Sequence, residues 1–281
     1  MNKKGKLYLV ATPIGNLDDI TIRAIKVLQN VDLIAAEDTR HSLKLLNHLE
    51  ISKPLISYHR HNEENKTEML INKLLNGENI ALITDAGTPA ISDPGEEVVK
   101  QAIEKEIEII PIPGACALIN ALICSGMNTR EFVFYGFLPL NKKLRKNKFG
   151  EIKKENKTII LYEAPHKINQ TLKDILQEVG DVNIVLAREL TKIHEEFIRG
   201  KISEIIEKYT DLKGEMIIVL EGNKFDNSTD KLTELLNNMS IEEHYNYYKK
   251  QNLEKKEIVK KMAKDRNVNK NEIYMKVINF N

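Results

Sequence analysis

The sequence lacks any stretch that would cross a membrane, and it has only two cysteines. No apolar run approaches the ~20 residues that a transmembrane helix needs. No apolar segment follows the charged start M-N-K-K-G-K, so we expect no secretory leader and a cytoplasmic location. The cysteines, Cys116 and Cys124, stand on one apolar segment, which favours free buried thiols in a reducing compartment over a disulfide.

The sequence also lacks a dominant charge. Lysine and arginine together number 42 and aspartate and glutamate 41, so the net charge of +1 indicates no class of partner. A hydrophobic content of 42% is near the globular norm and is enough for a substantial core. At 281 residues the chain suits two domains, or one large domain with an appendage.

Common nucleotide-binding and metal-binding motifs are absent as well. The loop over residues 12–16 lacks the Gly-Lys-Ser/Thr ending of a phosphate-binding loop, and no G-x-G-x-x-G occurs. His59 and His61 alternate in a predicted turn, but no cysteine or third ligand stands at a suitable spacing. We therefore expect no metal site and no dinucleotide fold of the common kind.

Strands and helices alternate along the first part of the chain, which predicts an α/β fold with a mostly parallel sheet covered on both faces. Short apolar runs predict strands at 6–11, 31–36, 54–57, 80–83 and 108–111. Helical periodicity and caps predict one helix that Asp18 or Asp19 caps and that ends at Leu28, and others at 42–49, 67–75 and 96–105.

Pro111, Pro113 and Gly114 mark a predicted hinge into a second α/β unit, whose closely spaced strands indicate a mixed sheet. Its predicted strands are 132–136, 158–162, 183–187, 194–199 (a hairpin partner) and 215–221, and its helices are 115–125, 167–178 and 203–209. A polar, linker-like stretch covers 222–240, and three short helices follow at 240–251, 253–265 and 270–279. The predicted domains are 1–113, 114–222, and a linker with a helical extension at 223–281.

The loop from Asp85 to Gly95, D-A-G-T-P-A-I-S-D-P-G, follows the buried strand predicted at 80–83. Glycine permits positive φ, and proline fixes φ and lacks an N–H donor, so this loop cannot form a regular element. It lies at the carboxyl edge of the predicted sheet, where ligands bind in open α/β folds. A second charged strand end, Glu37-Asp38-Thr39-Arg40, follows the strand at 31–36. An ordinary surface turn remains the alternative for the loop.

Nine segments in a fixed order carry a resemblance to one protein family. They are L-Y-L-V-A-T-P-I-G-N-L-D-D-I-T (7–21), A-E-D-T-R (36–40), S-Y-H-R-H-N-E (57–63), D-A-G-T-P-A-I-S-D-P-G (85–95), I-P-G-A-C-A-L-I-N-A-L (112–122), F-V-F-Y-G-F-L-P (132–139), Y-E-A-P-H-K-I (162–168), R-E-L-T-K-I-H-E-E-F-I-R-G (188–200) and G-E-M-I-I-V-L-E-G (214–222). With them the chain resembles the tetrapyrrole methylase superfamily of S-adenosylmethionine-dependent methyltransferases. Within it, the chain is most similar to bacterial small-subunit ribosomal RNA (cytidine-2′-O)-methyltransferases.

The resemblance implies two α/β domains with S-adenosylmethionine in the cleft between them, a homodimer, and a cytidine ribose of 16S ribosomal RNA as the methyl acceptor. The tail resembles the helix-turn-helix extension that many members carry. The cofactor-binding residues that it implies are Asp85, Ala86, Gly87, Thr88, Ile91, Pro113, Gly114, Ala115, Tyr162 and Met216. Relatives commonly have Pro and Ser where this chain has Ala115 and Cys116, which leaves no hydroxyl contact there.

Methyl transfer to a ribose hydroxyl needs a nearby proton acceptor, and an RNA acceptor needs cations. The candidate catalytic residues are Asp38, Glu37, His59 and Glu163. The candidate substrate-binding residues are Thr12, Pro13, Gly15, Asn16, Arg40, Lys142, Lys143 and Arg145. Each has a plainer alternative: a helix cap or surface ion pair for Asp38 and Arg40, helix capping for Glu163, and a solvated helix face for the basic segment 142–157.

Two other functions remain open. The same fold and cofactor could serve a tetrapyrrole acceptor, although the basic segment and the helical tail favour RNA. A non-catalytic RNA-binding or ribosome-assembly factor could keep the cleft as a scaffold, although the intact glycine and proline pattern of the loop argues against it. We expect partners to include ribosomal RNA, a second copy of the chain, and neither a membrane nor a metal.

Overall fold

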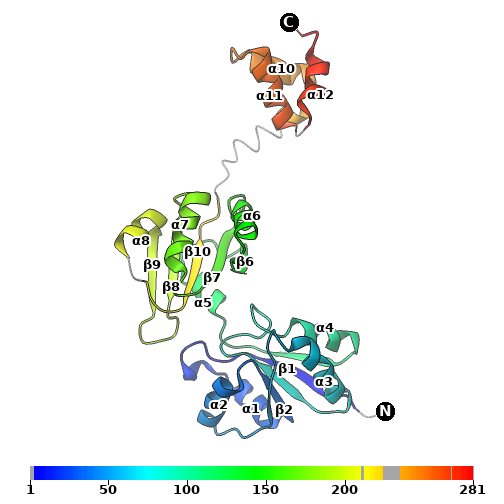
Figure 1. Ribbon diagram of the computed structural model, residues 1–281, viewed down its shortest axis with the longest axis vertical. Coiled ribbons are helices and arrows are strands. Elements are labelled where there is room, and N and C mark those ends of the chain that lie inside the picture. Colours follow the sequence, from blue (N-terminus) through cyan, green and yellow to red (C-terminus); the bar gives the residue numbers. More distant parts are fainter. Residues whose placement is uncertain (1–2, 210–211, 224–234, 267, 281) are drawn as a thin grey trace. The chain divides into compact units, whose positions relative to one another are not determined.

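The computed structural model describes residues 3–209, 212–223, 235–266 and 268–280 (Figure 1). The chain divides into two compact units, Met1–Asn223 and Lys224–Asn281, called here the larger unit and the C-terminal unit. The larger unit contains two separate five-stranded sheets. The predicted boundary between residues 113 and 114 falls between these sheets and remains a prediction.

The first sheet is entirely parallel, in the order β3-β2-β4-β1-β5. The central strand β4 is buried at all four positions, as expected of a strand covered on both faces. All five predicted strands occur within one or two residues of the expected bounds. They are β1 (Lys6–Val10), β2 (Leu33–Ala36), β3 (Leu55–Ser57), β4 (Ile80–Ile83) and β5 (Glu108–Ile112).

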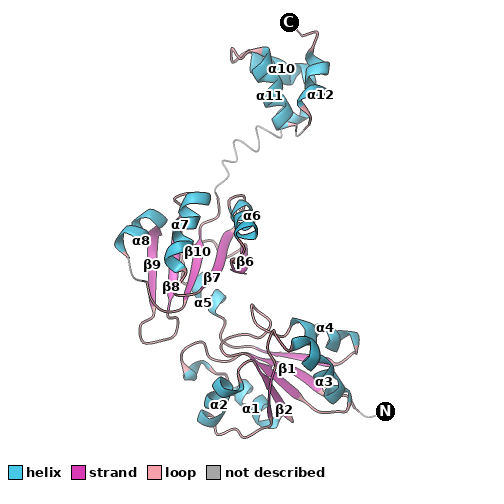
Figure 2. Cartoon of the chain, in the orientation of Figure 1, coloured by secondary structure: helices cyan, strands magenta, loops and turns pink. Residues whose placement is uncertain are grey.

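Helices cover both faces of this sheet, as Figure 2 shows. Leu70 of one helix and Val98 of another pack on one face, and Leu28 and Leu46 of two others pack on the opposite face. The elements are η1 (Leu17–Asp19, a 3₁₀ turn), α1 (Ile22–Asn30), α2 (Thr39–His48), α3 (Glu63–Leu75) and α4 (Glu96–Glu104).

The predicted start of the first helix is wrong. Thr21 caps α1, and its hydroxyl accepts a hydrogen bond from the Ala24 N–H at 3.1 Å. Asp18 and Asp19 instead belong to the 3₁₀ turn, which Asn16 caps. Two cap-forming residue types stand close together here, and the local chain geometry decides between them.

The second sheet is mixed, with the order β6-β7-β10-β8-β9 and one parallel pair, β6 with β7. The expected hairpin partner is present as β9, antiparallel to β8. The strands are β6 (Phe132–Phe137), β7 (Thr158–Glu163), β8 (Asn183–Arg188), β9 (Glu196–Lys201) and β10 (Met216–Leu220).

The two faces of the second sheet have different neighbours. Helices α6 (Lys142–Ile152), α7 (Ile168–Glu178) and α8 (Ile202–Lys208) pack on one face around Leu161 and Ile218. The short helix α5 (Ala117–Ile123) packs on the other face around Ile160 and Ile217. Ile14, from the first loop of the chain, joins this second cluster. The first loop therefore contacts the face that α5 covers only in part.

The C-terminal unit is a small helical bundle with its own core. Its helices are α10 (Ile241–Lys249), α11 (Lys255–Asp265) and α12 (Lys270–Val277). Met262, Ile273 and Val277 are buried among them, and so is Leu236, which precedes α10. The predicted linker at 222–240 is thus wrong at its end, because an apolar side chain there packs into the bundle; residues 224–234 lie outside the described part. None of the helices described in the chain is long and apolar enough to span a bilayer.

Candidate functional site

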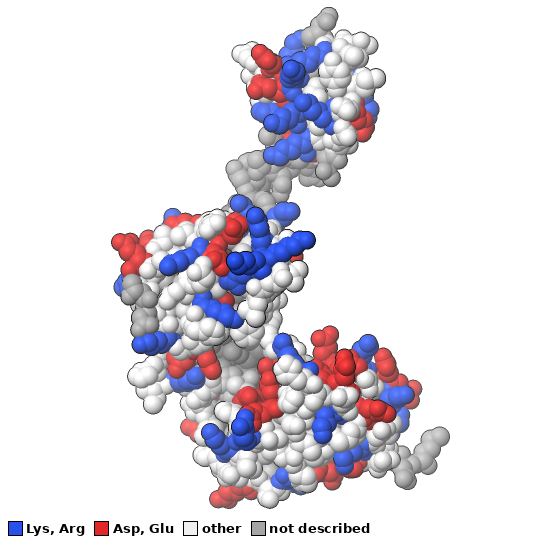
Figure 3. All heavy atoms as spheres, in the orientation of Figure 1, with Lys and Arg blue, Asp and Glu red and all other residues white. Residues whose placement is uncertain are grey.

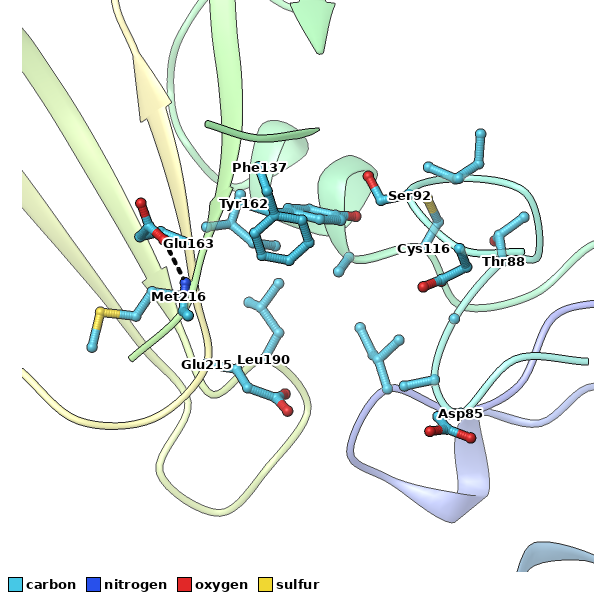
Figure 4. A pocket seen from close by; sticks show the side chains of 18 of the residues that line it. Asp85, Thr88, Ser92, Cys116, Phe137, Tyr162, Glu163, Leu190, Glu215 and Met216 are labelled. Atoms are coloured by element: carbon cyan, nitrogen blue, oxygen red, sulfur yellow. Dashed lines mark hydrogen bonds between the residues drawn. The ribbon is translucent and has the colours of Figure 1, made fainter. Parts of the chain in front are cut away.

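A cavity of about 470 Å³ lies between the loops of the first sheet and one face of the second (Figure 4). The Asp85–Gly95 loop supplies one side, and strands β7 and β10 with their flanking residues supply the other. The lining residues are Ile14, Glu37, Asp85, Ala86, Gly87, Thr88, Ile91, Ser92, Asp93, Cys116, Ala117, Phe137, Tyr162, Glu163, Ala164, Pro165, Ala187, Leu190, Glu215, Met216 and Ile217.

Three carboxylates, those of Glu37, Asp85 and Asp93, line the first side of the cavity. Glu37 follows β2 and Asp85 follows β4, and these strands are parallel neighbours, so their carboxyl ends meet at one edge. The Asp85 carboxylate also fixes the start of α2, because its Oδ1 accepts a hydrogen bond from the Asp38 N–H at 2.9 Å. This edge of the cavity therefore attracts a cation.

The proximity of these carboxylates changes their protonation. Burial, then repulsion from Glu37 and Asp85, raises the pKa of Asp93 to about 7, and Arg60 opposes the rise. Burial, then repulsion from Asp85, also raises the pKa of Glu37. Arg60 is held over the loop, where its guanidinium donates a hydrogen bond to the Ser92 carbonyl. Two carboxyl groups of the cavity can thus exchange protons at a higher pH than ordinary acids do.

Gly87 gives the loop its shape. Its φ is +87°, and an added Cβ would lie 3.3 Å from Ile14 Cγ2. Its N–H and carbonyl bond the main chain of Thr12 at 3.1 and 2.9 Å. Gly87 also lines the cavity, and its contact with a cofactor stays a prediction. Its positive φ lets the Asp85–Gly95 loop pass close to residues 12–16.

Thr12 and Thr88 fasten the loop to its neighbours. Thr12 is buried, and its hydroxyl donates to the Thr84 carbonyl at 3.2 Å. The Thr88 hydroxyl donates to the carbonyl of Ala115 at 3.0 Å, which ties the loop to the segment that enters α5. Both threonine hydroxyls are therefore engaged within the protein, so Thr12 supports the loop instead of contacting a substrate.

The opposite side of the cavity is apolar and aromatic. The ring of Tyr162 meets those of Phe134 and Phe137 edge to face, with centroids 4.9 and 5.6 Å apart. Its hydroxyl accepts a hydrogen bond from the Leu118 N–H at 3.2 Å, and burial raises the pKa of Tyr162 well above its usual range. Figure 4 shows Tyr162 and Phe137 beside each other at the cavity, with Leu190 nearby. A flat apolar group fits against this wall.

Asp38 and Arg40 have the plainer roles that the sequence left open. The Asp38 carboxylate caps α2 by accepting from the Arg40 N–H at 2.8 Å, and it pairs with the Arg40 guanidinium at 2.8 Å. These bonds hold the pKa of Asp38 well below its usual range. Neither residue lines the cavity. A carboxylate of low basicity outside the cavity is poorly suited to accept a proton.

Glu163 lines the cavity, but hydrogen bonds within the protein fix its carboxylate. Its carboxylate accepts from the Ala164 N–H at 2.8 Å and from the Thr171 hydroxyl at 2.5 Å. The same hydroxyl accepts from Arg145 at 2.7 Å, and Arg145 also pairs with Asp174 at 2.9 Å. Glu163 and Arg145 therefore belong to one network that joins β7, α6 and α7, which differs from the catalytic and RNA-contacting roles predicted for them.

The remaining predicted residues lie around the cavity. His59 is near Glu37, but it does not line the cavity, and its Nδ1 is buried without a hydrogen-bond partner among the described residues. Gly15 packs against Thr191 and Lys192 of the loop after β8, and Gly114 packs against the Ala11 side chain. Asn16 caps the 3₁₀ turn. Pro13 and Pro113 lie outside the lining, as do Lys142 and Lys143, which are exposed on α6.

Several cavity residues escaped the sequence reasoning. Asp93 and Ser92 stand within the quoted loop, yet nothing in the sequence distinguished them from turn-forming residues. Phe137 ends β6, inside the segment 132–139, and Glu215 precedes β10. The signal available for Asp93 was its position in the same loop as Asp85, and only the folded loop shows that both face the cavity. Among the described residues, no cluster of His, Cys, Asp and Glu could hold a metal ion.

Comparison with protein families decides what this fold is. Residues 6–206 match the model of the tetrapyrrole (corrin/porphyrin) methylases. The chain belongs to this family. Among curated relatives of the methylase, "Ribosomal RNA small subunit methyltransferase I" of Bacillus subtilis is 47% identical over 96% of this chain and 93% of its own length. The protein of the same name from Synechocystis sp. is 54% identical over 78% of this chain and 79% of its own length.

Solved structures agree with the fold of the methylase. A diphthine synthase structure superposes with a TM-score of 0.60 at 13% identity, covering 77% of this chain and 90% of that one. A cobalt precorrin-4 methyltransferase gives a TM-score of 0.56 at 17% identity, covering 76% and 94%. At such identities the likeness shows the fold alone.

The cofactor of this methylase family is S-adenosylmethionine, and the cavity fits it. The cofactor is a sulfonium cation that carries an ammonium group and a flat adenine. The carboxylates of Glu37, Asp85 and Asp93 suit the positive groups, and the aromatic side at Tyr162 and Phe137 suits the base.

Proposed function

We propose that this methylase transfers a methyl group to small-subunit ribosomal RNA, at the ribose 2′-hydroxyl of a cytidine in 16S RNA. The names of the curated relatives support an RNA acceptor in the small subunit, at 46% identity or more in Halalkalibacterium halodurans and in the two bacteria above. Those names specify neither the nucleotide nor the atom, and both are inferred from the family resemblance that the nine sequence segments carry. The carboxylate-lined cavity is the structural observation that carries the proposal.

Bound S-adenosylmethionine supplies an electrophilic methyl group on a sulfonium. The chain's own residues then have three tasks: to hold the cation, to orient the acceptor and to take up a proton. Asp85, at the end of β4, is placed to face a cationic group. The aromatic side formed by Tyr162 and Phe137 holds the flat base and excludes water from it.

Glu37 is the proton acceptor in this proposal. It lines the cavity at the end of β2, it is half-buried, and its raised pKa makes it a better base than an ordinary glutamate. Glu37 would take up the proton of the ribose 2′-hydroxyl on a carboxylate oxygen, while the bond between the methyl carbon and the sulfur of bound S-adenosylmethionine would break and neutral S-adenosylhomocysteine would leave. Asp38, also predicted for this role, has a lowered pKa and caps α2.

The RNA-binding surface of the larger unit includes the exposed lysines of α6. Lys142, Lys143 and Lys146 are exposed, and none forms an ion pair with a described residue. Lys148, by contrast, pairs with Glu151 at 2.5 Å and lies over the Tyr135 ring. Part of the basic segment is therefore available for phosphates, and part is engaged within the protein.

We also propose a cytoplasmic homodimer. Ile119 and Ile123 of α5 and Phe132 of β6 expose 41%, 63% and 37% of their surface. Ile119 and Ile123 are spaced by four residues and so lie on one side of α5, and exposed apolar side chains of this kind are often covered by a second copy of the chain. Sedimentation of the purified protein at several concentrations tests this part; a monomer at all concentrations would exclude it.

Methyl transfer from labelled S-adenosylmethionine to small subunits that lack the modification tests the main proposal. We expect label in 16S RNA, in a nucleotide that resists alkaline cleavage because its 2′-oxygen is blocked. Label in a porphyrinoid but not in RNA would show that the methyl acceptor is a tetrapyrrole. Absence of both transfer and cofactor binding by calorimetry would instead favour a scaffold.

A further inference from the structure

The helix α11 presents a row of free lysines on its outward face. Ile258, Val259, Met262 and Ala263 of this helix are buried in the core of the C-terminal unit. The opposite face carries Lys256, Lys260, Lys261 and Lys264, all exposed, and one acidic residue, Glu257. Figure 3 shows basic side chains gathered on the visible face of this unit.

Three of these lysines lie in one line. Lys256, Lys260 and Lys264 are spaced by four residues, which is about 6 Å per step along a helix and places them on one stripe. None of the three makes an ion pair or side-chain hydrogen bond with a described residue, and Glu257 lies beyond ion-pair distance of them. The stripe is therefore a linear array of uncompensated cations.

Three other lysines of this unit have internal contacts. Lys255 donates to the carbonyls of Ile278 and Phe280 and closes the bundle. Lys276 pairs with Glu272 at 2.7 Å, and Lys261 lies over the Tyr248 ring. In the linear sequence, lysines and acidic residues are interleaved along the tail. Lys250 and Lys270 also form no ion pair with a described residue, but they stand at the end of α10 and the start of α12 and not on the α11 stripe.

A linear array of cations on a rigid helix fits the regularly spaced phosphates of a nucleic-acid strand. The partner follows from the activity proposed above, on which this inference rests: an enzyme that modifies ribosomal RNA meets RNA phosphates on every approach. We propose that the outward face of α11 is a second RNA-binding surface, which contacts the phosphate backbone through Lys256, Lys260 and Lys264. Contacts of this kind position the substrate without reading its sequence.

The test compares the full-length protein with its Lys256→Gln/Lys260→Gln/Lys264→Gln variant. Glutamine removes the charge, is one atom shorter than lysine and has a similar helix propensity, so the bundle should be retained, which thermal unfolding checks. Binding of a 16S RNA transcript is measured by filter retention over a range of salt concentrations. Because each phosphate contact contributes about 0.7 to 0.9 to the slope of log K against log salt, we expect the slope to fall by about 2 to 3. Each single variant should remove about 1.

The matched control is Lys26→Gln/Lys100→Gln/Lys105→Gln, which removes the same charge from exposed positions of the larger unit. It should leave the slope within about 0.5 of wild type, since none of its lysines contacts RNA in this proposal. Equal loss in both triple variants, or no loss in the α11 variant, overturns the inference. Loss of duplex-DNA binding with RNA binding intact overturns it as well.

Methyl transfer is measured in the same preparations. The α11 variant should show a KM for unmodified small subunits that is raised roughly tenfold, with kcat and the Kd for S-adenosylmethionine unchanged. A wild-type protein that binds RNA through the stripe but transfers no methyl group would refute the proposed function and leave the inference standing. If the wild-type protein transfers methyl groups and the α11 variant has the same KM, the inference is refuted and the proposed function stands.

Discussion

The two sides of the cavity are built by sheets of different kinds, and they differ in chemistry accordingly. The first sheet is all parallel, so the carboxyl ends of its strands meet at one edge and bring Glu37 and Asp85 together there. The second sheet presents a face instead of an edge, and Tyr162 and Ile217 project from that face. Strand ends gather charge, whereas strand faces gather apolar surface.

This difference assigns separate tasks to the two sides. Loops can carry carboxylates because their main chain does not pair within a sheet. In a strand, successive side chains point to opposite faces, so one face of the second sheet can be apolar and rigid. Changes on the loop side should therefore affect charge, proton transfer and loop shape. Changes on the strand side should affect how well a flat group packs. The following predictions test the loop side from its largest effect to its smallest.

Gly87→Val should abolish binding of S-adenosylmethionine. Valine at a φ of +87° is strained by about 1–3 kcal/mol, and its Cβ would press on Ile14, so the loop that forms the acidic side would move. Calorimetry measures the cofactor Kd. Gly126→Val is the matched control, because Gly126 also has a positive φ of +77° but has open space around it. Full cofactor affinity in the Gly87 variant would refute the placement of the loop.

Glu37→Gln should lower kcat by about 10²- to 10⁴-fold, the usual contribution of a general base. Cofactor affinity should change little, because Asp85 and Asp93 keep the acidic side. In wild type, kcat should fall as pH falls through the raised pKa of Glu37, since the protonated acid cannot accept a proton. The variant should lack this pH dependence. Glu64→Gln, on the exposed side of α3, serves as the control, and a fully active Glu37 variant would exclude the proposed base.

Asp93→Asn should change stability and leave the pH profile of kcat close to that of wild type. Burial, then repulsion from Asp85, raises the pKa of Glu37, and Asp93 is not among the causes, so the acid limb of kcat should stay in place. The pKa of Asp93 rises on folding to about 7, so the folded state of wild type holds this proton more tightly than the unfolded state does. The free energy of unfolding of wild type therefore falls as pH rises from about 4 to about 7, and that of the variant does not. At pH 8 the free energy of unfolding of the variant should exceed that of wild type by about 1 kcal/mol, a figure that allows for the partial exposure of Asp93 to solvent.

Asp181→Asn offers a control of opposite sign for that stability measurement. Hydrogen bonds from Ser203 lower the pKa of Asp181, so its carboxylate stabilises the fold above its usual pKa, and this contribution is lost as pH falls. The two variants should therefore change the pH dependence of stability in opposite directions. The same direction in both would show that burial does not govern Asp93.

The sequence predicted the strands well because their apolar runs report burial directly. β4 is buried at every position and was found at its expected bounds. The loop after it was also recognised, because glycine and proline exclude regular structure there. Which carboxylate faces the cavity was not predictable, since Glu37 and Asp38 are adjacent and differ only in direction after β2. That direction depends on α2 beginning at Thr39, with Asp38 as its cap.

The same limit applies to the basic residues. Arg145 and Lys142 stand in one charged segment, yet Arg145 is drawn into the network of Thr171 and Asp174, while Lys142 stays exposed. Linear spacing gives the helix but not the partners that a neighbouring helix provides. Tertiary neighbours, here those on α7, decide which cations remain available.

Asp38→Asn should have the smallest effect, with kcat within about threefold of wild type. Asparagine caps a helix as well as aspartate does, so α2 should keep its start, and only the exposed pair with Arg40 is lost. Steady-state kinetics beside Glu37→Gln makes the comparison decisive, because the two residues are neighbours in sequence and differ only in the side of the edge they occupy. If Asp38→Asn lost 10²-fold in kcat with cofactor binding intact while Glu37→Gln stayed active, the proton would have to leave through the cap of α2, and the carboxylates of the cavity would serve binding alone.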